Sequence, residues 1–410
     1  MAFDPAEFRR RREQRDLQRQ KKAATAKRLR LLAIIGGSVA LVGCILALCL
    51  SLRGCDAANK PDAETTQPPN TTTVHLAATG DLNVTDKVVA SGNGQDYTGV
   101  FLDVAGILAQ ADITAVNFEG GLYGAPYGVD ASAPPALADA LQNAGVDLVQ
   151  LANSYAIAKG TSGLNATVNG IKAAGLTPMG AWADQTEAKA AKGYTIREVQ
   201  GIRMAFVAFT KGMDGMALPA ASMGCVNLLY KDYASSYQEV DTQGITRVLD
   251  AVAKEKPDLT VAFLHWGSEY NDTISTSQEQ IAKLMLQGGV DAIIGTHSHY
   301  VQKMVFDKDA GTFIAYSLGD FVGNADRAGS EYSVILDLEI TKNHDTGKTA
   351  VTGFGYTPIF TVAGETSVKL LQIQPAITAY DAGFLDRVSP ETYAAMAYAL
   401  TRIEARVKGE

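Results

Sequence analysis

Histidine is scarce in this chain, yet two of its five histidines, His297 and His299, stand one residue apart. They follow residues 290–294, an apolar run with the length and composition of a buried strand. Residues two apart lie on the same side of extended backbone, so both imidazoles can enter one crevice. Neutral imidazole is a common ligand of zinc, iron and manganese. The pair indicates either a metal site or an accidental loop, and partners elsewhere in the chain must decide between them.

Other residues of ligand type stand just after further short apolar runs. Asp81 follows residues 74–79, Asn117 and Glu119 follow 113–116, Asn153 follows 146–151, and His265 follows 259–264. In an open α/β sheet the C-terminal ends of the strands form the crevice where ligands bind, so five strands bring polar side chains to one edge. Mixed carboxylate, amide and imidazole groups suit a site of one or two metals that binds a phosphoryl or similar oxygen.

We therefore predict a divalent metal, Mn, Fe or Zn, bound at the edge of this sheet. The predicted ligands are Asp81, Glu119, His265, His297 and His299. The residues predicted to act on the substrate are His265, Asn153 and Glu269.

Three of these residues also have a purely structural interpretation. Asp81 follows Gly80 and can cap a turn. Glu119 can be a solvated loop residue, and His265 beside Trp266 can be a packed histidine whose nitrogens bond to the backbone. These alternatives stay open at the level of the sequence.

The elements that must position the site alternate between strands and helices. The runs that predict helices are 97–109, 135–144, 163–174, 240–254 and 278–287, and residues 194–199 and 203–209 predict a hairpin. Such alternation predicts an α/β fold with a largely parallel sheet. After His299 the runs are strand-like, at 301–306, 312–316, 332–340, 350–358 and 368–374, and predict a second, more antiparallel sheet. Residues 389–407 predict a closing helix with Ser389 as its N-cap.

The charge of the chain is unevenly distributed. Residues 1–30 hold eleven Lys or Arg against four Asp or Glu, a net of +7, whereas the remainder holds 25 against 40, a net of −15. An acidic body argues against nucleic acid as a partner.

A run of 22 uncharged residues, 31–52, follows the basic segment. As a helix it would be about 33 Å long, enough to cross a bilayer core of about 30 Å. The basic residues before it would stay in the cytoplasm and the body would lie outside the cell. We favour this single-pass anchor in the cell membrane over a cleaved signal peptide, whose apolar core and basic N-region would be shorter. We favour it also over a lipoprotein cleaved before Cys44, because apolar residues continue after Cys44.

The predicted organisation has five parts. They are a basic cytoplasmic arm at 1–30, a transmembrane helix at 31–52, a Pro/Thr-rich linker at 53–73, the main domain at 74–380 and a C-terminal helix packed on that domain at 381–410. Of four cysteines, only Cys225 lies in the main domain, so no disulfide framework or cysteine-based metal motif is predicted.

The main domain resembles a known family over residues 74–325. The stretches that carry the resemblance are Ala78-Thr79-Gly80-Asp81, Asn117-Phe118-Glu119, Leu151-Ala152-Asn153, His265-Trp266-Gly267-Ser268-Glu269-Tyr270, Gly295-Thr296-His297-Ser298-His299 and Tyr316-Ser317-Leu318-Gly319-Asp320-Phe321. They are similar to bacterial capsule-synthesis proteins of the CapA type, linked to poly-γ-glutamate production, in the metallophosphatase-like superfamily. The resemblance implies a four-layer α/β/β/α sandwich, and the apolar run at 31–52 predicts a single transmembrane helix before it.

The chain also departs from the family pattern. The family usually has Asn-Asn-His where this chain has Asn153-Ser154-Tyr155. In the wider superfamily that histidine helps to protonate the leaving group. Tyrosine is a poor acid or base near neutral pH, because its ordinary pKa is about 10. The departure puts the usual catalysis in doubt.

Three functions remain open. The first is a membrane-anchored protein that helps to make or export an anionic capsule polymer such as poly-γ-glutamate, with that polymer or its synthesis machinery as partner. The second is a scaffold on the same fold that binds polymer or partner proteins but no longer catalyses. The third is a metallophosphoesterase acting on a small nucleotide or lipid phosphate.

Overall fold

The computed structural model describes residues 70–93, 95–384 and 388–410, all within one compact unit, Pro68–Glu410. The predicted arm at 1–30, the predicted membrane helix at 31–52 and most of the predicted linker at 53–73 lie outside the described residues. Among the helices of the described part, none has the length and apolar content needed to cross a bilayer.

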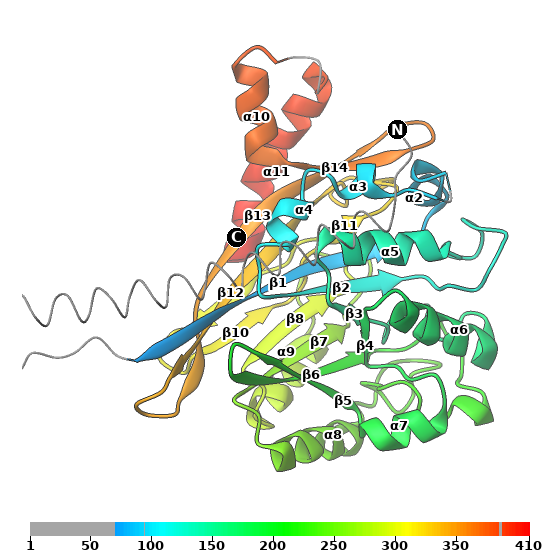
Figure 1. Cartoon of the computed structure of the whole chain (residues 1–410), viewed down its shortest axis with the longest axis vertical. Helices are drawn as coiled ribbons and strands as arrows, with labels where there is room; N and C mark the ends of the chain where they lie inside the picture. The colour runs from blue at the N-terminus through cyan, green and yellow to red at the C-terminus, as the bar shows by residue number, and fades with distance from the viewer. Residues whose placement is uncertain (1–69, 94, 385–387) are drawn as a thin grey trace, which may run out of the picture. The chain divides into compact units, whose positions relative to one another are not determined.

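The first sheet is built around β1 (Thr71–Asn83), which lies at its centre (Figure 1). Parallel strands on one side are β2 (Ile113–Glu119), β3 (Leu148–Gln150) and β4 (Thr177–Met179). Antiparallel strands on the other side are β12 (Tyr332–Asn343), β13 (Thr349–Ala363) and β14 (Val368–Gln372). A short strand, β11 (Asp320–Val322), also pairs with β1, in parallel. This topology places the C-terminal ends of β1, β2 and β3 along one edge.

The second sheet has the order β5-β6-β7-β8-β10-β9. Its strands are β5 (Tyr194–Val199), β6 (Ile202–Thr210), β7 (Leu259–His265), β8 (Ala292–Thr296), β9 (Met304–Asp307) and β10 (Thr312–Ala315). β5 and β6 form the predicted hairpin, while β6, β7, β8 and β10 run parallel.

The prediction that the strands after His299 form a sheet of their own is wrong. β9 and β10 extend the second sheet, whereas β12, β13 and β14 extend the first. The reason is the long pairing of β12 with β1, which runs in register from Thr71 to Ala78. Each sheet is therefore mixed, and the structure confirms the α/β class with two sheets.

Two apolar layers hold the second sheet in place. Successive side chains of β6 point to opposite faces of the sheet, as in any strand. Met204 and Phe206 belong to the core shared with the first sheet, whereas Ala205 and Val207 belong to an outer cluster. The outer cluster contains residues of α8 (Thr242–Glu255) and α9 (Thr276–Gln287). These two amphipathic helices therefore cover the outer face of the second sheet.

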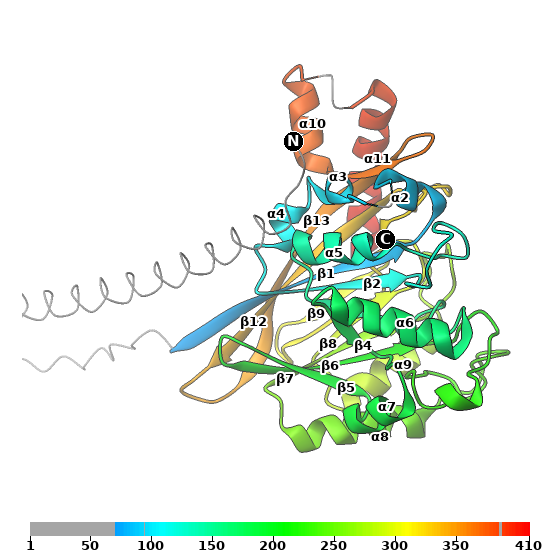
Figure 2. The ribbon, with the colours of Figure 1, turned by 45° about the vertical axis from the view of Figure 1, so that its right-hand side comes forward.

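The remaining helices lie mostly in the first half and at the end of the chain (Figure 2). They are α2 (Asp86–Ser91), α3 (Thr98–Phe101), α4 (Ala105–Leu108), α5 (Pro135–Ala144), α6 (Gly160–Ala173), α7 (Gln185–Ala191), α10 (Ile373–Asp381) and α11 (Pro390–Lys408), with a short 3₁₀ turn at Ala220–Ser222. α10 and the start of α11 stand side by side and project beyond the sheets in both ribbon views, while α10 keeps contact with β13 and β14.

Three predicted boundaries compare directly with these elements. The closing helix is confirmed, since the Ser389 side chain accepts a hydrogen bond from the Thr392 amide at 3.1 Å. The single helix predicted over 97–109 is wrong, because it is two short helices, α3 and α4. The strand predicted over 368–374 ends at Gln372, and α10 begins at Ile373 with Gln372 as its N-cap.

Candidate metal centre

The five predicted metal ligands converge in one buried cluster. Asp81 and Glu119 come from the ends of β1 and β2, His265 from the end of β7, and His297 and His299 from the turn after β8. None of these five residues is more than 6% exposed. Strand ends of two different sheets therefore deliver the carboxylates and the imidazoles to the same place.

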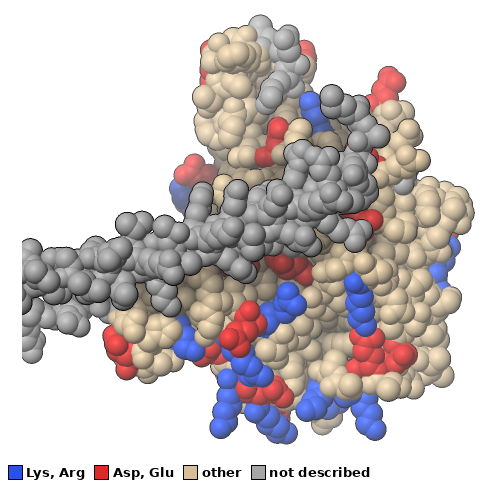
Figure 3. Space-filling view, viewed as in Figure 1, with Lys and Arg blue, Asp and Glu red and all other residues tan. Residues whose placement is uncertain are grey.

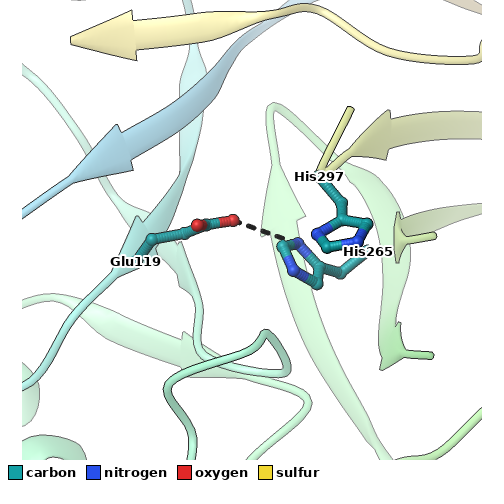
Figure 4. Close-up of side chains that lie close together, drawn as sticks. All are labelled: Glu119, His265 and His297. Atoms are coloured by element: carbon teal, nitrogen blue, oxygen red, sulfur yellow. Dashed lines mark ion pairs between the residues drawn. The ribbon is translucent and has the colours of Figure 1, made fainter. Parts of the chain in front are cut away.

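A first group of potential ligand atoms joins Glu119, His265 and His297 (Figure 4). A Glu119 carboxylate oxygen lies 3.3 Å from His265 Nδ1, and the two imidazole rings lie 4.4 Å apart, centre to centre. Burial, together with nearby positive charge, lowers the pKa of His265 and of His297 well below the ordinary value. Both rings are therefore neutral, the form that binds a metal.

A second group joins Asp81, His299 and Asp320. His299 Nδ1 lies 2.7 Å from an Asp320 oxygen and 3.7 Å from an Asp81 oxygen. Burial opposes the charged imidazolium, but Asp320, Glu119 and Asp81 outweigh it and raise the pKa of His299 to about 11. Burial also raises the pKa of Asp81 to about 6, against the opposing pull of His299.

Asn117 connects the two groups. Its Nδ2 atom donates to Asp81 Oδ1 at 2.6 Å and to Glu119 Oε1 at 3.1 Å. Asn153 holds Asn117 in turn, since Asn153 Nδ2 donates to Asn117 Oδ1 at 3.0 Å and to the Phe118 carbonyl oxygen at 2.7 Å. Asn153 Oδ1 accepts a hydrogen bond from the Tyr155 amide. Asn153 therefore holds its neighbours in place, and its role in catalysis stays a prediction.

The donor set fits a divalent cation. Three carboxylates, Asp81, Glu119 and Asp320, are buried together; the His299 imidazolium offsets only part of their charge, and burying carboxylates without full compensation is costly. The His297 Nδ1 atom is buried and has no hydrogen-bond partner among the described residues. Carboxylate oxygens and neutral imidazole together are ligands of manganese, iron and zinc. One or two such ions would satisfy both the carboxylates and the unpartnered nitrogen.

Asp320 is the ligand candidate that the sequence reasoning missed. It lies directly opposite Asp81 in the pairing of β1 with β11, and the Asp81 amide donates to the Gly319 carbonyl oxygen at 3.0 Å. A signal was present, because Gly319-Asp320 repeats the Gly80-Asp81 pattern. Unlike Asp81, however, Asp320 does not stand at the end of its strand, because β11 begins at Asp320 itself.

Close backbone contact positions these residues. A side-chain carbon on Gly80 would lie 1.7 Å from the Gly319 carbonyl oxygen, and one on Gly295 would lie 1.9 Å from the Tyr316 carbonyl oxygen. Only glycine fits at either place. The turn itself is strained, with φ of 88° at His297 and 59° at His299, values that non-glycine residues rarely adopt. The His297 amide donates to Asp81 Oδ2 at 2.9 Å, which ties that turn to β1.

A cavity of about 430 Å³ opens onto the cluster, and its wall includes Glu119, His299 and Asp320. Glu269, one of the residues predicted to act on the substrate, lines this cavity but belongs to neither ligand group. Ser154 also lines it and lies 3.3 Å from His265 Nε2. Burial raises the pKa of Tyr155, on the same wall, to about 12, further from neutrality than an ordinary tyrosine.

Comparison with known proteins shows a family relationship. The sequence model of the family "Bacterial capsule synthesis protein PGA_cap" matches residues 75–325. The capsule biosynthesis protein CapA of Bacillus anthracis is 28% identical over 63% of this chain and 61% of its own length. The PGA biosynthesis protein CapA of Bacillus subtilis is 29% identical over 52% of this chain and 51% of its own length. The chain thus spans only about half to three fifths of these curated relatives.

Similar solved structures include a phosphatase from Mycoplasma pneumoniae and the NAD nucleotidase of Haemophilus influenzae. The first is 13% identical, with a TM-score of 0.43 over 71% of this chain and 94% of its own length. The second is 12% identical, with a TM-score of 0.43 over 82% of this chain and 60% of its own length. Structural similarities with TM-scores this low say nothing about the activity of this chain.

Proposed function

Because the chain belongs to the bacterial capsule synthesis protein PGA_cap family, we propose that it helps to make or export an anionic capsule polymer such as poly-γ-glutamate. The names of the Bacillus relatives, for capsule and PGA biosynthesis, support this polymer class. Residues 31–52 would anchor the chain in the cell membrane with residues 1–30 in the cytoplasm, so that the main domain meets the polymer and its synthesis machinery outside the cell.

We propose further that the domain has the metallophosphatase-like four-layer arrangement and binds divalent metal, Mn, Fe or Zn. The observation that supports the metal is the pair of adjacent buried groups, Glu119-His265-His297 and Asp81-His299-Asp320. When bound, such an ion would supply Lewis acidity at a phosphoryl or acyl oxygen and would lower the pKa of a bound water. Asn117 would fix the distance between the two groups, and Ser154 would orient His265 through its Nε2 atom.

Metal analysis of the full chain, purified in mild detergent, tests this proposal. We expect Mn, Fe or Zn at one or two ions per chain, and loss of at least one ion in His297→Ala. His75→Ala is the matched control, because His75 lies on β1 in a half-exposed hydrogen bond with Asp337, away from both groups. A wild-type chain that contains no metal, and takes up none from solution, would refute metal binding.

The scaffold alternative is favoured by one specific observation. Tyr155 stands where the superfamily uses a histidine, and burial raises the pKa of Tyr155 to about 12. A strain that carries only His297→Ala separates scaffold from enzyme, provided that the variant reaches the membrane in normal amount. Polymer production at the wild-type level would establish the scaffold, and loss to the level of a deletion strain would establish a metal-dependent role. Turnover of a phosphodiester that disappears in His297→Ala would instead favour the phosphoesterase.

A further inference from the structure

The cavity above the ligand cluster presents a charge problem for an anionic polymer. Its wall carries five carboxylates, from Glu119, Asp214, Glu269, Asp320 and Asp326. On the face shown in Figure 3, basic side chains over α7 and α8 are interleaved with acidic ones and form no broad basic surface among the described residues. Recognition of a polyanion therefore needs a local cation besides any bound metal.

Arg327 is the only Lys or Arg on the described wall of this cavity. Its guanidinium carbon lies 4.3 Å from the centre of the Tyr270 ring, a cation–π contact. No described carboxylate forms an ion pair with Arg327; its neighbour Asp326 faces Lys87, at 3.8 Å. The guanidinium donors of Arg327 are therefore available to a ligand.

Tyr270 connects Arg327 to the ligand cluster. His299 also contacts the Tyr270 ring and stacks on it at 4.9 Å between ring centres with an angle of 25°. The Tyr270 amide donates to the Ser298 carbonyl oxygen at 2.8 Å, and Tyr270 adopts φ of 52° to make that contact. The Arg327 guanidinium carbon can therefore lie no farther from the centre of the His299 ring than the sum of these two distances.

The segment that carries Arg327 is held at several points. The Arg327 carbonyl oxygen accepts from the amide and the hydroxyl of Ser330, at 3.0 and 2.9 Å. Tyr300 donates its hydroxyl to the Ala328 carbonyl oxygen at 2.9 Å, and Asn324 Nδ2 donates to Asp86 at 3.0 Å. A cation held in this way loses less conformational entropy on binding than a free surface arginine does.

We propose that Arg327 binds a carboxylate of an acidic chain while a neighbouring unit of the same chain reaches the carboxylate–histidine cluster. The planar guanidinium matches a carboxylate through two parallel hydrogen bonds, which lysine cannot reproduce. The substrate class is a polymer with a carboxylate on each unit, and Arg327 is the residue that selects for it. This inference rests on the proposed function, because it identifies which part of an anionic polymer the site recognises.

Calorimetric titration of the full chain in detergent, with Mn²⁺ added, tests the proposal. The probe is a short γ-linked glutamate oligomer, and its neutral analogue with amidated carboxylates is the control ligand. We expect Arg327→Gln to raise the Kd for the oligomer at least about 10-fold, the loss of a hydrogen bond to a charged group. Arg327→Lys should give a smaller loss, and the amidated analogue should bind wild type and Arg327→Gln equally.

The matched control is Arg197→Gln, which removes the same charge from an exposed position on β5, remote from the cavity wall. A Kd of Arg327→Gln within twofold of that of Arg197→Gln would overturn the proposal and leave the proposed function standing. Failure of metal-loaded wild type to bind the oligomer would overturn both the role of Arg327 and the assignment of the polymer. Arg327-dependent binding by a chain that holds no metal would support the proposal while refuting the metal site.

Discussion

Gly80→Ala is the sharpest test of how the site is built, because it acts on the backbone contact between β1 and β11. The new methyl carbon would lie 1.7 Å from the Gly319 carbonyl oxygen, whereas ordinary contacts begin at 3.4 Å, so the strands must separate by the difference, about 1.7 Å. That movement breaks the hydrogen bond from the Asp81 amide to Gly319, about 0.5–1.5 kcal/mol. Overpacking adds about 1–3 kcal/mol. We expect a total loss of about 1.5–4.5 kcal/mol in the free energy of unfolding.

The assay is urea unfolding of the full chain, followed by circular dichroism, with metal affinity measured on the same samples. Gly355→Ala is the matched control, since a methyl group there meets nothing within 4 Å. The control should keep or slightly raise the stability, because alanine restricts the unfolded chain. Gly80→Ala should also bind metal at least about 10-fold more weakly, since Asp81 and Asp320 move apart. Equal stability of the two variants, within about 0.5 kcal/mol, would refute the rigid contact on which this geometry depends.

Two further predictions concern the second ligand group. Asp320→Asn should weaken metal binding at least about 10- to 100-fold, measured by competition titration with a metal indicator. Asp326→Asn, which removes the same charge from the cavity wall, should change metal binding little. Equal losses in the two variants would mean that general charge, and not coordination, holds the ion. The pKa of His299 is about 11 in the metal-free native state and about 6.5 unfolded, so the native state keeps a proton that the unfolded state releases, and stability falls as pH rises between these values. Between about pH 7 and 9, metal-free wild type should lose about 1.4 kcal/mol per pH unit more than metal-free His299→Gln, and parallel profiles in urea unfolding would contradict a protonated His299.

The sequence predicted the site better than it predicted the sheets. His297 and His299 could be found because histidine is rare and the pair follows a recognisable strand, and Asp81, Glu119 and His265 follow strands of the same kind. Asp320 was missed, although Gly319-Asp320 repeats the Gly80-Asp81 pattern, because the three-residue strand that it begins has no periodic signal of its own and is defined by its pairing with β1. The prediction of which sheet the strands after His299 join was wrong for a related reason. The partner of β12 is β1, more than 250 residues earlier, and local hydrophobic patterns contain no information about such pairing.

The proposed role of Arg327 bears on how an acidic domain would meet the proposed acidic polymer. The body beyond residue 30 has a net charge of −15, so long-range attraction cannot bring a polyanion to it. Short-range recognition remains effective, because salt at cellular concentrations screens the repulsion between exposed charges that lie more than about 8–10 Å apart. A guanidinium stacked on Tyr270, beside a ring of His299, acts within that range. If neighbouring proteins of the proposed synthesis machinery instead deliver the polymer to this domain, weak capture from solution would be no obstacle.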